Sequence, residues 1–225
     1  WSIPFREEDF QLINGTEGQA WNLQLINGTL FCAHNRGAFI LNGNLISQTL
    51  DSTGYWSFKG VPGKPDKIIA SNYNGFSLLE NRNGNWVLIN QIKGFSKSVG
   101  EFELSNTNLW VKKDENLFQL KLDSNYSRFI SIKTHKKLSE KDSGITSVQR
   151  IKNSVVFQYN NHFYTYSEKK NKFEPNMFLT KIFQKIPKTN TIVEDKAGNI
   201  WYVIKETIGV LKKNKNGTYV VSLEV

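Results

Sequence analysis

Apolar and polar residues alternate in short runs along most of the chain, and turn-forming residues separate the runs. The stretch LFCAHNRGAFIL, residues 30–41, shows the plan: an apolar run, the polar residues Asn-Arg-Gly, and a second apolar run. A period of two interrupted by such a turn predicts a β-hairpin. No segment keeps an apolar period of 3.6 residues, so we expect almost no helix.

The same plan recurs at residues 68, 109, 155 and 200, at intervals of 38, 41, 46 and 45 residues. A period of about 40–50 residues is typical of the blades of a β-propeller. Gly37 and Gly75 close the first two turns, where we expect a positive φ. The repeat therefore favours a propeller over an unrelated series of hairpins.

Each hairpin is flanked by two further apolar segments, which we interpret as the outer strands of a four-stranded sheet. The preceding strands are expected at residues 20–25, 55–61, 100–105, 145–151 and 190–195. The following strands are expected at residues 45–50, 85–92, 127–132, 178–183 and 218–224. We predict an all-β fold, a β-propeller segment of five four-stranded antiparallel blades that is part of a larger propeller.

The expected organisation is one partial β-propeller over residues 1–225. Residues 1–19, with an apolar segment at 9–13, would end a preceding blade, and the blades follow at 20–50, 55–94, 98–133, 144–184 and 188–225. The chain opens on Trp without a charged and apolar leader, so we expect an excerpt or a processed form. No apolar run approaches ~18 residues, so we expect no membrane span in this segment.

The single cysteine, Cys32, stands two residues before His34, as a nucleophile and a base might. The repeat argues otherwise, because the equivalent positions of the other copies are apolar or aromatic: Ala70, Val111, Phe157 and Tyr202. Side chains at i and i+2 of a strand also point in parallel rather than at one another. We expect a buried thiol without a catalytic or metal-binding role.

The net charge of +9 comes from the second half of the chain, where 20 Lys and Arg oppose 11 Asp and Glu. Of the basic residues 24 are Lys and 5 are Arg, and base-reading proteins rely on the bidentate fork of Arg. This favours a solvated surface and no nucleic-acid contact.

Acidic residues provide no convincing catalytic pair. Glu7 and Glu8 are adjacent in sequence, Glu101 and Glu103 are two residues apart, and Glu194 and Asp195 belong to an expected turn. Nothing in the pattern places two carboxylates across a cleft, so we predict no catalytic residues, no metal and no cofactor. Two alternatives stay open: a propeller enzyme acting on glycans as a lyase or hydrolase, and a protein-interaction scaffold.

The turns of the first two hairpins carry the best candidates for ligand binding. In a propeller, these turns and the starts of the first strands lie on one face. The candidate residues are His34, Asn35, Arg36, Tyr73, Asn74, Trp21 and Trp56. They offer hydrogen-bond donors and aromatic faces suited to polar or sugar-like ligands, although polar turns also occur without a function. Two further tryptophans, Trp110 and Trp201, are expected to pack between blades.

Three stretches carry a family resemblance: EGQAWNLQLINGTLFCAHNRGAFIL (17–41), GYWSFKGVPGKPDKIIASNYNGFSLLENRNGNWVLINQIKGF (54–95) and DKAGNIWYV (195–203). They resemble the two-component-regulator-type propellers of periplasmic sensor domains. Those domains belong to bacterial hybrid histidine kinases and LuxR-type helix-turn-helix regulators with a triple-tyrosine domain. The glycine that often ends the second strand in that family is absent here.

The resemblance implies a non-catalytic periplasmic sensor, the ectodomain of an inner-membrane protein. It implies an unknown small-molecule ligand, such as a glycan fragment, whose binding shifts a homodimer between two arrangements. It also implies contacts with the remaining blades and with a tyrosine-rich β-sandwich of the same protein. The output would be signal transduction and regulation of transcription.

Overall fold

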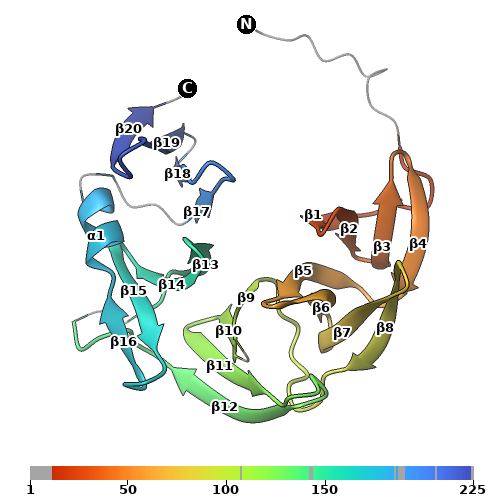
Figure 1. Cartoon of the computed structure of the whole chain (residues 1–225). Helices are drawn as coiled ribbons and strands as arrows, with labels where there is room; N and C mark the ends of the chain where they lie inside the picture. Colours follow the sequence, from red (N-terminus) through yellow and green to blue (C-terminus); the bar gives the residue numbers. More distant parts are fainter. Residues whose placement is uncertain are drawn as a thin grey trace, which may run out of the picture. The chain divides into compact units, whose positions relative to one another are not determined.

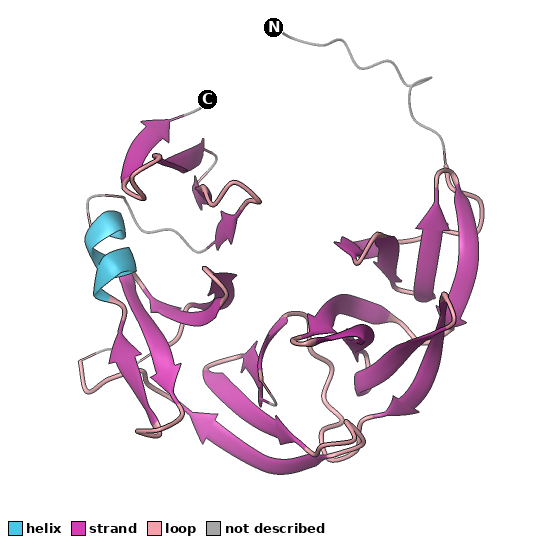
Figure 2. Cartoon of the chain, viewed as in Figure 1, coloured by secondary structure: helices cyan, strands magenta, loops and turns pink. Residues whose placement is uncertain are grey.

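The expected hairpins pair into separate four-stranded sheets in the computed structural model of the chain (Figure 1 and Figure 2). The structure describes residues 12–106, 108–141, 144–184, 186, 191–205 and 207–223. These residues form five antiparallel sheets, each with its strands in chain order. The fold is all-β, a β-propeller of five four-stranded blades, as the repeat predicts.

The blades have the following strands. The first contains β1 (Ala20–Ile26), β2 (Thr29–His34), β3 (Gly37–Asn42) and β4 (Leu45–Asp51). The second contains β5 (Tyr55–Val61), β6 (Lys64–Asn72), β7 (Gly75–Arg82) and β8 (Asn85–Gln91). The third contains β9 (Phe102–Ser105), β10 (Asn108–Lys113), β11 (Asn116–Leu122) and β12 (Phe129–His135).

The last two blades complete the series. The fourth contains β13 (Ser147–Ile151), β14 (Ser154–Tyr159), β15 (His162–Ser167) and β16 (Lys172–Pro175). The fifth contains β17 (Thr191–Glu194), β18 (Ile200–Ile204), β19 (Thr207–Lys213) and β20 (Tyr219–Leu223). A helix, α1 (Met177–Phe183), lies between these two blades in the sequence. Within the described ranges no helix is long and apolar enough to cross a bilayer.

The chain divides into two compact units. The first comprises residues 1–101 and 122–130, and the second comprises residues 102–121 and 131–225. The first two blades belong to the first unit, and the last two belong to the second.

The strand preceding the first blade is not observed. Leu12 and Ile13 are not in a strand, and the rest of the segment expected at 9–13 lies outside the described residues. Ile13 instead packs against a small cluster on the first sheet that contains Cys32, Phe39 and Leu41. Ile13 therefore covers part of an apolar face of the first sheet.

The core of the first unit lies between its two blades. Phe31 of the first blade packs with Phe58 and Trp86 of the second, at ring-centroid distances of 5.2 and 5.3 Å. Cys32, the next residue on β2, belongs to the cluster on the opposite face and is 2% exposed. Successive residues of a strand point to opposite faces, so both sides of β2 are buried.

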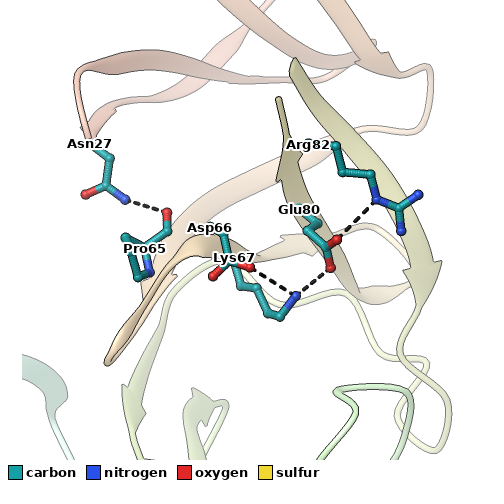
Figure 3. A network of polar contacts seen from close by, with 6 residues as sticks. All are labelled: Asn27, Pro65, Asp66, Lys67, Glu80 and Arg82. Atoms are coloured by element: carbon teal, nitrogen blue, oxygen red, sulfur yellow. Dashed lines mark hydrogen bonds and ion pairs between the residues drawn. The ribbon is translucent and has the colours of Figure 1, made fainter. Parts of the chain in front are cut away.

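A charged network ties the strands of the second blade (Figure 3). Lys67 on β6 lies opposite Glu80 on β7 and binds its carboxylate, while the Nε of Arg82 binds the other carboxylate oxygen at 3.1 Å. The Nδ2 of Asn27, in the β1–β2 turn, donates to the carbonyl of Pro65 at 2.8 Å. This last bond joins the first blade to the second.

The two glycines that close the first hairpin turns are needed for different reasons. Gly75 has φ 121°, and an added Cβ would collide with the carbonyl oxygen of Phe95. Gly37 does not have a positive φ, contrary to expectation, but an added Cβ would lie 2.6 Å from the carbonyl oxygen of Asp51. Space, rather than backbone conformation, requires glycine at that position.

The fourth blade corrects the prediction of a strand at residues 178–183. That segment is α1, and the last strand of the blade is β16, which precedes it. The Oδ1 of Asn176 accepts a hydrogen bond of 3.1 Å from the amide of Leu179, which caps the helix. Leu179 and Phe183 are one turn apart and share the buried face.

Trp110 and Trp201 have different environments. Trp110 is 1% exposed and packs on Phe157 of the fourth blade with a ring-centroid distance of 4.7 Å, as expected for a residue between blades. Trp201 is only half-buried, and its Nε1 donates to the carboxylate of Asp195 at 2.9 Å. Trp201 is therefore less buried than the expected core packing implies, because the edge of its ring binds the preceding turn.

Candidate functional site

Three of the candidate aromatic residues meet at the surface of the first unit. Trp21 on β1 and Trp56 on β5 have ring centroids 4.7 Å apart, and Trp56 and Tyr73 have centroids 5.1 Å apart. Trp21 is 40% exposed, Tyr73 is 36% exposed and Trp56 is half-buried. We call this group the aromatic platform. It joins the first strands of two blades to the β6–β7 turn.

Hydrogen bonds fix the rings of the platform. The Nε1 of Trp21 donates to the hydroxyl of Tyr73 at 3.0 Å, and the Nε1 of Trp56 donates to the Oγ of Ser98 at 2.9 Å. Both indole donors are thus bound within the protein. The platform can therefore offer its ring faces to a ligand with little loss of side-chain entropy.

Gly54 brings the first hairpin turn against the platform. A Cβ added at Gly54 would lie 2.5 Å from the ring of Tyr73 and 2.8 Å from the carbonyl oxygen of Asn35. The amide of Tyr73 also donates to the carbonyl of Gly54 at 3.0 Å. The absence of a side chain at this position allows the two turns to approach each other.

His34 does not face solvent. It is fully buried, and its ring packs on Phe39 with a centroid distance of 5.5 Å. Its Nδ1 accepts the amide of Arg36 at 3.1 Å, so its Nε2 carries the proton and donates to the carbonyl of Thr16 at 3.2 Å. The side chain shapes the turn and is not available to a ligand.

The other turn residues differ in exposure. Asn35 is half-buried, and its Oδ1 accepts the amide of Gln19 at 3.2 Å. Arg36 and Asn74 are exposed. The Nη1 of Arg36 donates to the carbonyl of Glu17 at 3.3 Å. Backbone hydrogen bonds, and then the charge of Arg36, lower the pKa of the Glu17 carboxyl.

Three of the carboxylates considered for catalysis bind protein groups. Glu103 is 6% exposed, and its Oε2 pairs with the Nε of Arg150 at 3.4 Å. Glu194 accepts the amide of Lys152, and Asp195 binds the side chain of Trp201. Glu7 and Glu8 lie outside the described residues. The arrangement does not present two carboxylates to one substrate.

Metal binding is not supported by the described part of the chain, which contains no group of three His, Cys, Asp or Glu side chains that could hold an ion. Cys32 is a buried free thiol, and burial raises its pKa. A thiol with a raised pKa is a poor nucleophile at neutral pH.

Sequence reasoning missed Gly54 and Ser98, which position the platform. Gly54 stands in an ordinary Ser-Thr-Gly turn, and Ser98 lies in a segment without strand alternation. No local signal distinguishes them, because each acts on a side chain of a different segment.

A scan against protein-family models gives no match, and a search of curated protein sequences gives none either. Solved structures do match. The extracellular domain of BT4673 from B. thetaiotaomicron, described as a one-component and as a hybrid two-component system, gives a TM-score of 0.59 at 16% identity over 93% of this chain. The extracellular domain of BT3049, a hybrid two-component system of the same organism, gives 0.56 at 12% identity over 94%.

This chain spans 28% and 30% of the length of those two proteins. A protein of Bacteroides fragilis named for 6-phosphogluconolactonase activity also matches, with a TM-score of 0.55 at 9% identity over 92% of this chain and 70% of that one. The likeness confirms the propeller fold and agrees with the family resemblance of the repeats. At these identities it does not transfer an activity.

Proposed function

We propose that this chain is a ligand-binding part of the ectodomain of a bacterial transmembrane signalling protein, and that it performs no chemistry itself. The exposed aromatic platform is the observation that carries the proposal. The likeness to extracellular domains of signalling systems supports the role and an extracellular or periplasmic location. The occupied carboxylates and the buried thiol support binding rather than catalysis.

The ligand that suits the platform is a carbohydrate fragment. The apolar face of a sugar ring packs well against an aromatic ring, while its hydroxyl groups need hydrogen-bond partners at the edge. Trp21 and Tyr73 supply exposed ring surface, and the neighbouring turns supply the exposed side chains of Arg36 and Asn74. The fixed indole donors favour recognition by stacking.

The segment is also proposed to be part of a larger propeller that signals as a homodimer. Leu23 and Leu25 on β1 are exposed, and so are Val203 and Ile208 on the fifth blade. Exposed apolar sheet faces of this kind are usually covered. Further blades and a tyrosine-rich β-sandwich of the same protein are the proposed partners.

Calorimetric titration with soluble oligosaccharides tests the proposal. We expect a bound oligosaccharide to lose at least tenfold in affinity in Trp56→Ala and Tyr73→Ala, and severalfold in Arg36→Ala, with each variant still folded at the temperature of the titration. Phe178→Ala, at an exposed ring of the second unit, is the matched control and should bind normally. Unchanged affinity in Trp56→Ala, Tyr73→Ala and Arg36→Ala would place the site elsewhere. Cleavage of the oligosaccharide by the native protein would contradict the proposed sensor function and would identify the protein as a glycan lyase or hydrolase.

A further inference from the structure

A cavity of about 240 Å³ lies in the second unit, and the residues that line it are distinct from those of the aromatic platform. Its lining residues come from the end of β12, the segment that follows it, and the β15–β16 hairpin. His135, Tyr166 and Phe173 form an aromatic wall, and Lys137, Glu140 and Lys172 are among the other lining residues. Nothing in the sequence pattern pointed to this site.

The aromatic wall is packed from behind. The ring of His135 lies 5.1 Å from that of Phe173 at 82°, and 6.0 Å from that of Tyr166. Buried Trp110 contacts all three rings, at 4.8 Å from Tyr166, 5.8 Å from His135 and 5.9 Å from Phe173. The wall is therefore continuous with the core. Its rings cannot move into the cavity without disturbing the packing around Trp110.

Polar contacts also fix the wall. The hydroxyl of Tyr166 donates to the Oδ1 of Asn171 at 2.6 Å, and the Nζ of Lys133 donates to the same atom at 3.1 Å. The Nε2 of His135 lies 3.2 Å from the Oε1 of Gln119 and donates to it. Burial, and then the charge of Lys133, lowers the pKa of His135, so its ring is neutral at pH 7. A ligand would meet a preformed, uncharged aromatic surface.

Positive charge surrounds this surface. Residues 133–140 and 166–174 carry six lysines and three glutamates. Glu140 pairs with Lys137 at 2.6 Å, and Glu174 pairs with Lys170 at 2.6 Å. The third carboxylate, that of Glu168, accepts the Nδ2 of Asn108 at 2.7 Å. The excess of lysines favours an anion at the mouth of the cavity.

We propose that this cavity binds a small organic anion with one flat apolar ring, of which an aromatic carboxylate is the simplest example. The ring would lie against the wall of His135, Tyr166 and Phe173, and the carboxylate would meet the ammonium groups of Lys137 and Lys172. Cavities for drug-sized ligands measure about 300–1,000 Å³, so this smaller one suits a single ring. Because Lys137 already pairs with Glu140, Lys172 is the more important cation.

Two-dimensional NMR with 4-hydroxybenzoate as the probe tests the proposal, and its neutral isostere 4-hydroxybenzamide is the ligand control. We expect the benzoate to shift the indole signal of Trp110 with a millimolar or lower Kd, and the amide to bind at least fivefold more weakly. Lys172→Glu should weaken binding of the benzoate by at least tenfold. The control Lys215→Glu changes the net charge equally at an exposed turn and should leave the Kd of the benzoate unchanged.

Three results would overturn the proposal: no shift of Trp110 at 10 mM benzoate, equal binding of the amide, or equal weakening by the two charge reversals. The test is independent of the aromatic platform, because Trp56→Ala should leave benzoate binding unchanged. A loss of benzoate binding in Trp56→Ala alone would assign the probe to the platform and also overturn the proposal.

Discussion

The indole nitrogen of Trp21 donates a hydrogen bond of 3.0 Å to the hydroxyl of Tyr73, 52 residues later in the chain. The bond links the first strand of one blade to a hairpin turn of the next. Both rings also pack against Trp56 in tilted arrangements, so the three side chains form one surface. The relationship depends on the packing of the two blades, and several measurable consequences follow from the geometry around it.

Replacement of Tyr73 by Phe should remove the bond and keep the ring. Because Trp21 is 40% exposed, its freed Nε1 can bind water, so we expect a loss of less than ~1 kcal/mol in the free energy of unfolding. Urea denaturation gives this value, and a red shift of the tryptophan emission should report the wetter indole. A loss above ~2 kcal/mol would show that the hydroxyl of Tyr73 stabilises the fold more than its exposure indicates.

Asp195 should contribute stability that depends on pH. Its carboxylate accepts from the Nε1 of Trp201 and from the side chain and amide of Asn199, at 2.8 to 2.9 Å. These bonds, with that from Trp201 first, lower the pKa of Asp195 from 3.8 to about 2. The folded state therefore favours the charged form, and the stabilisation is fully present above pH 4 and is lost as the pH falls towards 2.

Asp195→Asn should accordingly unfold at a lower urea concentration than the native protein at pH 7. The difference between their midpoints should shrink as the pH is lowered from 4 to 2. Asp114→Asn, at an exposed turn aspartate with positive φ, is the control and should show no such convergence. A difference for Asp195→Asn that stays constant down to pH 2 would contradict the assignment.

Trp110 and Trp201 should differ in their contributions to stability. Trp110→Ala removes a ring packed between the third and fourth blades and should cost about 3–5 kcal/mol. Trp201→Ala removes a half-buried ring and one hydrogen bond and should cost about 1–2 kcal/mol. Equal losses in guanidinium denaturation would mean that Trp201 belongs to the core after all.

Asn176 should stabilise α1 as its N-terminal cap. Asn176→Ala leaves the amide of Leu179 without its side-chain acceptor and should cost about 1 kcal/mol in thermal or urea unfolding. Asn176→Ser, which keeps an acceptor, should recover most of that loss. If Ala and Ser are equally destabilising, the cap is not the source of the effect.

Cys32 should react slowly with a thiol reagent in the native protein. It is 2% exposed, and burial raises its pKa, so little thiolate is present at pH 7. The rate with a chromogenic disulfide should rise by orders of magnitude in denaturant. Fast reaction under native conditions would show that the β2 strand opens readily.

The repeated hairpin pattern was enough to predict the blades, because short apolar runs separated by turn residues indicate where each strand begins and ends. Cys32 illustrates this: its apolar counterparts in the other copies identified it as a core residue, and it is buried. The segment at 178–183 shows the limit. Six residues with apolar positions at both ends fit a strand or a helix equally well. The cap at Asn176 and the burial of Leu179 and Phe183 stabilise the helix over a strand.

The sequence by itself determined the fold class, the strands around each hairpin turn and the burial of the lone thiol, since these depend on local periodicity. It also indicated Trp21, Trp56 and Tyr73 as one group, because equivalent positions of a repeat lie on the same face. Only the tertiary structure decided that His34 is buried, that Gly54 and Ser98 position the platform, and that His135, Tyr166 and Phe173 line a cavity. These features depend on contacts between residues distant in the chain, which no local pattern specifies.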